Sequence, residues 1–330
     1  MMWSLSLLSS VLFLHRSLAL APTYSDSIFS PYIVEKYDRI EADRWTSGFL
    51  PGSFYLLEER KGLCPNNEAL NSVDWLTYGR HWSNGLIPLQ GGNAQEHDQG
   101  FLAIPYLEEL KINPTNLLFK AADLSGNQTL IDMAISHANK TIANHAQSSD
   151  ITLTRATRKT APGHEVKLGV YMDSPKCSTS PINHYLDAAR RMAKVFLSRL
   201  PSDGIPPYDF DAPTPNRPAD TSAATIAAEG LFILAEAEAY VSSNVVQSIT
   251  PPHPIHNPEQ NVTGEDYYKE QGVKLLVHNF KFALQPTWDS ILSNGTSNAR
   301  RNNTNTGLVY GDYYAIQAGN TMLKLGLASC

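Results

Sequence analysis

Cysteine is scarce in this chain of 330 residues, which contains only Cys64, Cys177 and Cys330. No pair of them has the short spacing of metal ligands, so we expect no zinc site. We also expect no other metal and no cofactor. Three cysteines leave room for one disulfide in an oxidising compartment. We expect Cys64 to pair with Cys330, because that bond would tie the carboxyl end to the first third of the chain.

Runs of Lys and Arg are also missing, and the formal net charge is -6. A chain without a basic face does not suit nucleic acid, so we expect no nucleic-acid partner. Beyond the first 21 residues, no apolar stretch approaches the roughly 20 residues of a membrane-spanning helix. With 42% hydrophobic and 18% charged residues, the composition is that of an ordinary globular protein. We therefore expect a soluble monomer without a membrane partner.

Residues 1–21 resemble a secretory signal peptide. An apolar run over residues 3–14 is followed by Ala19-Leu20-Ala21, an A-x-A cleavage pattern. Pro22 would hinder cleavage after Ala21, so the cut can also fall after Ala19. No Lys or Arg precedes the run, and a buried first helix is the alternative reading. Export is supported by five N-x-S/T sequons, at Asn127, Asn139, Asn261, Asn294 and Asn302. We expect a secreted, extracellular glycoprotein.

Helical periodicity dominates the rest of the chain. Apolar residues recur at steps of three and four in residues 128–146, 181–200 and 220–241. Further helices are predicted at 25–38, 53–61, 68–81, 99–110, 114–124, 264–283 and 312–326. A strand is indicated only at 165–172, and residues 147–180 and 243–262 are predicted surface loops. Helices in antiparallel pairs predict an all-α toroid of hairpins, with a generic helical bundle as the alternative.

Two segments carry side chains suited to a sugar site. Trp45 lies in a glycine-bearing loop before a helix, where its indole can stack on a sugar ring; core packing is the alternative. Asp98 follows His97 where a loop enters the next predicted helix. A carboxyl group at this position can transfer a proton, although it can also cap the helix. His97 is either a structural hydrogen-bonding residue or a contact to a substrate carboxylate.

In these segments and several others, the chain resembles glycoside hydrolase family 88, the unsaturated glucuronyl hydrolases, in a fungal-type form. WTSGFLPG at 45–52 resembles the family's early tryptophan loop, and HDQGF at 97–101 resembles its His-Asp-x-Gly-Phe segment. The remaining resemblance, in chain order, lies in residues 115–123, 137–141, 203–213, 220–224 and 310–314. The family fold is an (α/α)6 barrel of six helical hairpins, so we expect one such domain over residues 22–330.

The resemblance implies a hydrolase that adds water across the C4=C5 double bond of a terminal unsaturated uronic acid. The family uses two aspartates for this step, and the first corresponds to Asp98. His97 and Trp45 correspond to substrate-binding positions. The expected substrates are unsaturated uronic oligosaccharides of the kind that polysaccharide lyases produce.

Two pieces of the family pattern are missing from this chain. Where the family's second aspartate opens Asp-Asn-Met, this chain has Ile112-Asn113-Pro114. We expect no other aspartate to replace it: Asp123 lies at the far end of its predicted helix, Asp209, Asp211 and Asp220 satisfy backbone donors in a loop and a cap, and Asp312 is a packing residue. The family's Ser-x-Trp-x-Arg-Gly-Gln-Ala-Trp segment is also absent between Thr160 and Tyr185. Either the gene has decayed or exons were omitted from the coding sequence, and we favour the second. We expect an incomplete barrel with impaired activity; the alternatives are a non-catalytic sugar-binding remnant and an unsaturated rhamnogalacturonyl hydrolase.

Overall fold

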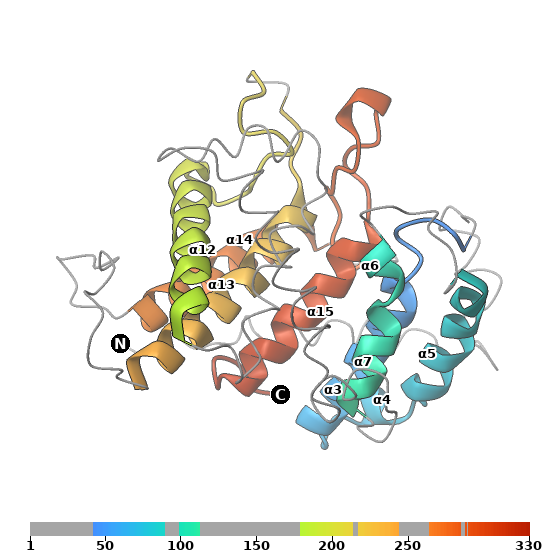
Figure 1. Ribbon diagram of the computed structural model, residues 1–330. Coiled ribbons are helices and arrows are strands. Elements are labelled where there is room, and N and C mark those ends of the chain that lie inside the picture. Colours follow the sequence, from blue (N-terminus) through green and yellow to red (C-terminus); the bar gives the residue numbers. More distant parts are fainter. Residues whose placement is uncertain are drawn as a thin grey trace. The chain divides into compact units, whose positions relative to one another are not determined.

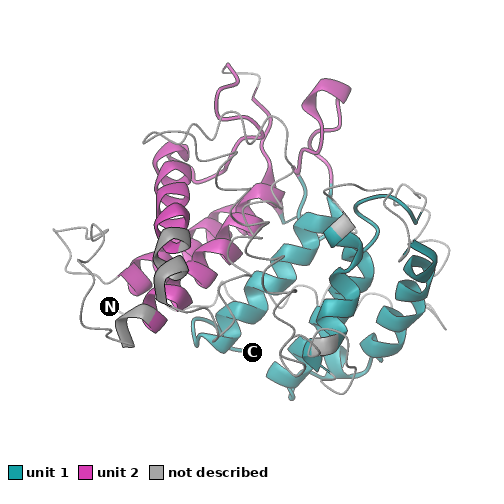
Figure 2. Cartoon of the chain, in the orientation of Figure 1, with its two compact units in different colours: residues 1–127, 284–293, 307–330 teal, residues 128–283, 294–306 magenta. Residues whose placement is uncertain are grey.

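A computed structural model of the chain describes residues 42–89, 99–112, 179–213, 217–243, 264–284, 288 and 290–330 (Figure 1). These residues form two compact units (Figure 2). Unit 1 comprises residues 1–127, 284–293 and 307–330, and unit 2 comprises residues 128–283 and 294–306. The described residues are helical, and their only β contacts are three isolated bridges.

Unit 1 contains α-helices from both ends of the described chain. They are α3 (Phe49–Leu63), α4 (Glu68–Asn71), α5 (Trp75–Ser83), the 3-10 helix η2 (Asn84–Leu89), α6 (Gln99–Leu102), α7 (Ile104–Ile112) and α15 (Val309–Lys324). Helix α3 packs against α5, α7 and α15. Its buried side chains include Phe54, Tyr55, Leu56 and Leu57, which cover all of its faces. A helix buried on every side belongs at the centre of its unit.

The buried polar groups of α3 are paired with α15. The Arg60 guanidinium, 6% exposed, donates from Nε to Asn320 Oδ1 at 2.7 Å and from Nη2 to the Ile316 carbonyl at 3.0 Å. Asn320 in turn donates to the Leu56 carbonyl at 2.8 Å. A buried cation without such partners would be strongly destabilising, so these bonds specify how the two helices meet.

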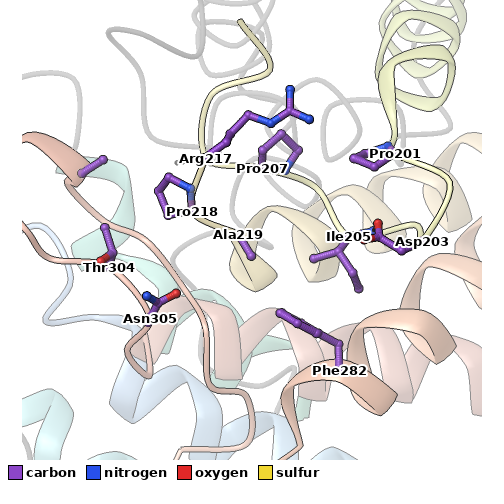
Figure 3. Close-up of a pocket in the computed structure, with 11 residues that line it drawn as sticks. Pro201, Asp203, Ile205, Pro207, Arg217, Pro218, Ala219, Phe282, Thr304 and Asn305 are labelled. Carbon is purple, nitrogen blue, oxygen red and sulfur yellow. Dashed lines mark hydrogen bonds between the residues drawn. The ribbon is translucent and has the colours of Figure 1, made fainter. Parts of the chain in front are cut away.

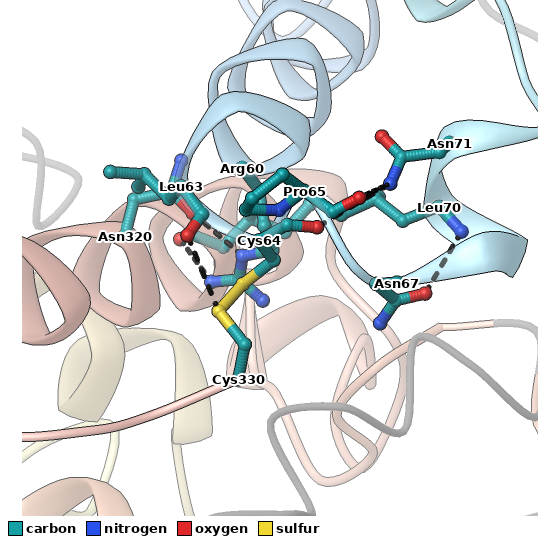
Figure 4. The surroundings of a disulfide bond; sticks show 10 residues. Arg60, Leu63, Cys64, Pro65, Asn67, Leu70, Asn71, Asn320 and Cys330 are labelled. Atoms are coloured by element: carbon teal, nitrogen blue, oxygen red, sulfur yellow. Dashed lines mark hydrogen bonds between the residues drawn. A yellow bond between two sulfur atoms is a disulfide. The ribbon is translucent and has the colours of Figure 1, made fainter.

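The predicted disulfide between Cys64 and Cys330 is confirmed (Figure 4). Their Cα atoms lie 5.6 Å apart, a usual separation for a disulfide. Cys64 directly follows α3, and Cys330 ends the chain six residues after α15. The bond therefore joins the carboxyl end of the chain to the central helix of unit 1.

The described residues of unit 2 form three long helices joined to irregular segments. The helices are α12 (Thr179–Arg199), α13 (Thr221–Ser243) and α14 (Gly264–Ala283), and one irregular segment carries the 3-10 helix η4 (Ala299–Arg301). Helices α13 and α14 share an extensive apolar interface, and α12 packs against α13. Across that second contact, Arg190 donates from both Nε and Nη2 to the Glu238 carboxylate, at 2.6 Å each. This two-bonded geometry fixes the register of α12 on α13.

Most helix predictions that fall on described residues are confirmed, with local corrections. The predicted 264–283 helix has the bounds of α14, and α13 lies within two residues of the prediction. The single helix predicted at 68–81 is wrong, because Asn67 and Asp74 each cap a separate helix by accepting a bond from Leu70 N and Thr77 N. The helix predicted at 99–110 is likewise divided, by a turn at Ala103.

Several predictions lie outside the described residues. They are the signal peptide, the helices at 25–38, 114–124 and 128–146, the strand at 165–172, nearly all of both predicted loops, and the sequons at Asn127, Asn139 and Asn261. Among the described helices, none is long and apolar enough to cross a membrane.

Candidate functional site

Trp45 lies in a cluster of aromatic rings in unit 1. Its ring centroid is 5.2 Å from that of Tyr310, 5.6 Å from Phe101 and 6.1 Å from Phe49. Trp45 itself remains partly exposed, whereas Phe49, Phe101 and Tyr310 are buried. The indole therefore packs on an aromatic base and keeps part of its surface exposed. Core packing and sugar stacking, the two interpretations of Trp45, are both compatible with this position.

The tryptophan loop also touches the backbone that follows Asp98. A Cβ atom on Gly48 would lie 2.0 Å from the Phe101 carbonyl oxygen, and one on Gly52 would lie 2.5 Å from Ile104 Cγ2. No other residue type allows so close an approach without displacing backbone. Gly48 thus explains how the WTSGFLPG segment meets the end of the HDQGF segment, and Gly52 brings α3 close to the start of α7.

His97 and Asp98 themselves lie outside the described residues. The structure places their sequence neighbours: α6 begins at Gln99, and Phe101 contacts Trp45. Three sequence motifs therefore converge in unit 1, namely the tryptophan loop, the end of the HDQGF segment, and residues 310–314 through Tyr310 and Tyr313. The roles of His97, Asp98 and Trp45 stay predictions.

Two carboxylates of α7, Glu108 buried and Glu109 partly buried, lie close to this convergence and were not singled out in the sequence. Glu108, 5% exposed, accepts from Tyr313 Oη at 2.8 Å and from Lys111 Nζ at 3.0 Å. Glu109 accepts from Tyr55 Oη at 2.9 Å and from Arg80 Nε at 2.7 Å. Burial raises the pKa of Tyr55 above its ordinary value. The hydrogen bond with Ser83 acts in the opposite direction, and Glu109 raises the pKa further. Both carboxylates form hydrogen bonds that join α7 to other helices, so neither is available to replace the missing second aspartate.

Asp312, in the first turn of α15, is a further carboxyl group of unit 1. Its Oδ1 accepts from the backbone N–H groups of Ile291 at 3.0 Å and Leu292 at 3.2 Å. Burial raises its pKa to about 7, although the two backbone bonds act in the opposite direction. These bonds hold the 290–292 segment against the start of α15, which agrees with the interpretation of Asp312 as a packing residue.

The aspartates of unit 2 mostly have the structural roles predicted for them. Asp220 Oδ1 accepts from Ser222 N at 3.2 Å and Ser222 Oγ at 2.6 Å at the start of α13. Asp209 accepts from the backbone N–H of Asp211 at 2.8 Å. Asp211 was expected to bond backbone donors, and this is wrong: it forms an ion pair with Arg199. Asp123, which belongs to unit 1, lies outside the described residues.

A cavity of about 730 Å³ opens within unit 2 (Figure 3). Its wall is partly apolar, and the ring of Phe282 at the end of α14 is 44% exposed. In Figure 3 the side chains of Ile205 and Phe282 point toward each other. The lining residues are Pro201, Asp203, Ile205, Pro207, Arg217, Pro218, Ala219, Phe282, Ala299, Thr304 and Asn305. Nothing in the sequence pointed to this cavity, because it is assembled from the 201–219 loop, the end of α14 and the 299–305 loop.

Among the described residues, no group of three or more His, Cys, Asp or Glu side chains is arranged to hold a metal ion. The polar groups named above are bonded to other side chains and to backbone. The described part of unit 1 thus offers an aromatic surface in contact with the residues that directly follow one candidate acid–base residue.

Comparison with known proteins supplies the context for this geometry. No family model matches the chain. The chain is 24% identical to the "Unsaturated glucuronyl hydrolase" of Formosa agariphila over 378 residues, which cover 92% of this chain and 83% of that protein. The matched length exceeds the 330 residues of this chain, so the relative carries residues between the matched segments that this chain lacks.

Solved structures of unsaturated glucuronyl hydrolases have the same fold. An enzyme described as specific for heparin has a TM-score of 0.68 at 15% identity, covering 97% of this chain and 98% of that chain. The Streptococcus agalactiae enzyme has a TM-score of 0.63 at 16% identity, covering 98% and 92%. The Bacillus sp. GL1 enzyme has a TM-score of 0.57 at 15% identity, covering 97% of each chain. The resemblance to unsaturated glucuronyl hydrolases is therefore confirmed in sequence, and the fold is the six-hairpin (α/α)6 type of those enzymes.

Proposed function

We propose that this protein is a glycoside hydrolase of the unsaturated glucuronyl type. The observation that carries the proposal is the convergence in unit 1 of the tryptophan loop with the segment that directly follows Asp98. The match to a named unsaturated glucuronyl hydrolase over 92% of the chain supports it. One structural neighbour, a mutant Streptococcus agalactiae enzyme, was solved in complex with dGlcA-GalNAc6S. The substrates proposed here are unsaturated uronic oligosaccharides.

The proposed reaction is hydration of the C4=C5 double bond. A proton is added to C4, and the oxygen of water is added to C5 as the water loses a proton. The resulting hemiketal opens and releases the neighbouring sugar. Asp98 is the proposed acid–base residue, His97 contacts the substrate carboxylate, and Trp45 stacks on the sugar ring. A carboxyl group partly removed from solvent has a pKa suited to such proton transfer.

The same proposal includes impaired turnover. The family's second aspartate has no counterpart at residues 112–114, and the carboxyl groups of Glu108, Glu109 and Asp312 are held by other side chains or by backbone. Because addition of water needs both a donor and an acceptor of protons, loss of one carboxyl group slows the reaction by roughly two to four orders of magnitude. The extra length of the matched relative supports a loss of segments.

The test follows the absorbance of the substrate double bond at about 235 nm. We expect slow loss of absorbance with the wild-type protein and none with Asp98→Asn. Glu270→Gln is the matched control, because this carboxylate lies on the exposed surface of α14 and pairs only with Lys274 among the described residues. Fast turnover that Asp98→Asn abolishes would disprove the impairment. Slow turnover that survives Asp98→Asn would disprove the proposed role of Asp98.

A non-catalytic sugar-binding protein is the second candidate function, favoured by the same missing aspartate. Calorimetric titration with unsaturated uronic oligosaccharides separates it from the first. Binding without any loss of absorbance supports this second candidate, and a protein that neither binds nor hydrolyses these sugars contradicts both.

The cavity of unit 2 offers a further surface for a sugar chain. A partly exposed Phe282 ring can stack on a sugar face, and Arg217 and Asn305 supply polar groups at the wall. We expect Phe282→Ala to weaken the binding of uronic oligosaccharides at this cavity about two- to tenfold in calorimetric titration, from an aromatic contact worth about 0.5–1.5 kcal/mol. Tyr240→Ala is the control, since this ring is 51% exposed in the same unit and does not line the cavity. Equal affinities of the two variants for these sugars would exclude the cavity as a sugar-binding surface.

Export from the cell completes the proposal. Residues 1–21 serve as a signal peptide, and the mature protein acts extracellularly as a monomeric glycoprotein. The Cys64–Cys330 disulfide supports this assignment, because such bonds persist in oxidising compartments. Nucleic acid and membranes are not among the proposed partners.

A further inference from the structure

Two glycosylation sequons lie in one loop of unit 2, in opposite environments. Both belong to residues 294–306, which lead from the cavity region toward α15. The first is Asn294-Gly295-Thr296 and the second is Asn302-Asn303-Thr304. An N-linked glycan is bulky and hydrophilic, so the folded protein can carry it only where the asparagine reaches solvent.

The first sequon is built into the structure of unit 2. Thr296 is 1% exposed, and its hydroxyl donates to the Ala219 carbonyl at 2.7 Å. Gly295 and Thr306 exchange backbone hydrogen bonds at 2.8 and 3.0 Å, and the Asn294 carbonyl accepts from Thr221 N at 3.3 Å. Asn294 is itself partly buried. A glycan here would have to displace the contact between this loop and the start of α13.

The second sequon lies at the tip of the same loop. Asn302 and Asn303 are exposed, and Asn302 follows η4 with φ of 57°, a left-handed conformation that asparagine tolerates. The turn is closed without its side chain: Asn302 N donates to the Ala299 carbonyl at 3.2 Å, and Asn298 Oδ1 accepts from Arg301 N at 3.2 Å. Among the residues that the structure describes, none is hydrogen-bonded to the Asn302 amide group.

We propose that Asn302 carries an N-linked glycan in the secreted protein and that Asn294 does not. The inference rests on the proposed export, and it goes beyond the hydrolase function. Thr304 and Asn305 line the unit 2 cavity, so a glycan on Asn302 is attached two residues from the cavity wall. The sequon motif alone treats the two asparagines alike, and only their environments distinguish them.

The test is to secrete the full chain from a eukaryotic host with a leader that is known to function, so that the result does not depend on residues 1–21. Treatment with peptide-N-glycosidase converts each glycosylated asparagine to aspartate, which mass spectrometry of peptides detects. We expect conversion at Asn302 and none at Asn294 in the wild-type protein. The Asn302→Gln variant should lose one glycan on a gel, and Thr304→Ala should lose the same one.

The Asn294→Gln variant is the control, and its glycan number should match that of the wild type. Because Asn294 has φ of 59° and Gln is strained there, the wild-type peptide map decides if this variant does not fold. An unmodified Asn302, or a modified Asn294, overturns the inference. The absorbance assay on the same preparation, before and after deglycosylation, reports the proposed hydrolase activity separately.

Discussion

Asp220 shows how a single buried carboxyl group connects two parts of unit 2. It is 3% exposed, caps α13 through Ser222, and accepts from Thr296 N at 3.4 Å in the 294–306 loop. Burial raises the pKa of Asp220 to about 6, although its hydrogen bonds from Ser222, Thr296 and Ala223 act in the opposite direction. The folded protein therefore holds a proton on Asp220 at pH values where the unfolded chain has released it.

This shift predicts a pH-dependent stability. Between about pH 4 and pH 6 the folded state binds more protons than the unfolded state, so the free energy of unfolding falls as pH rises through that window. The contribution of Asp220 is on the order of 3 kcal/mol. Asp220→Asn should remove this part of the slope, because an amide oxygen can still accept from Ser222 and Thr296.

Chemical denaturation of both proteins at pH 4.5 and pH 7.5 checks the prediction. The difference between wild type and variant isolates Asp220 from other titrating groups, such as Asp312. If the free energy of unfolding changed equally with pH in the wild type and the variant, Asp220 would have the same pKa in the folded and unfolded chains.

Side-chain hydrogen bonds between residues far apart in the sequence were the hardest to predict. Glu108 and Glu109 are adjacent in the sequence, and yet Glu108 bonds Tyr313 of α15 while Glu109 bonds Tyr55 of α3 and Arg80 of α5. No periodic pattern relates those partners. By contrast, the capping role of Asp220 follows from its place before an apolar helix, and was correctly predicted.

At the scale of helices, the sequence predicts those with a clear start and a regular apolar pattern. The bounds of α14 agree, because Gly264 follows a proline-rich stretch and acidic residues occupy the first turn. Helix α3 begins at Phe49, four residues before the prediction, since Pro51 is tolerated within a first turn. Short helices such as α4 and α5 depend on side-chain caps at Asn67 and Asp74, which a periodicity search overlooks.

The contact of α3 with α6 gives a prediction at the same scale. Gly48→Ala places a methyl group 2.0 Å from the Phe101 carbonyl oxygen, so the tryptophan loop must separate from α6. We expect a loss of about 1–3 kcal/mol in the free energy of unfolding, as for other overpacked positions, with loss of any hydrolase activity.

Gly62→Ala, in the last turn of α3, is the control, because a Cβ added there meets no packing neighbour within 4 Å. There alanine should stabilise the helix by up to about 1 kcal/mol. Thermal unfolding followed by circular dichroism compares the two variants. A Gly48→Ala protein as stable as Gly62→Ala would contradict the close approach of the two motifs.

At the scale of the whole molecule, the order of the motifs along the chain predicted the fold, which the local structure of each motif alone did not. Each motif is short, but their sequence order identified a fold that comparison with solved structures confirms. The fate of the segments between them could not be predicted in this way, since a hairpin can be deleted while the residues on either side still match. The pairing of Cys64 with Cys330 was predicted from the benefit of closing a long segment of chain.

That disulfide should contribute to the stability of unit 1. Cys64 and Cys330 are separated by 266 residues, so the bond greatly restricts the unfolded chain. We expect Cys330→Ser to lower the free energy of unfolding by about 2–5 kcal/mol. Reduction of the disulfide in the wild type should lower the free energy of unfolding by a similar amount. Cys177→Ser should leave the free energy of unfolding unchanged, both with the disulfide intact and after reduction. If Cys177→Ser and Cys330→Ser lowered the melting temperature equally, Cys177 would have to take part in the bond, and the carboxyl end would not be fixed to α3 in the way described.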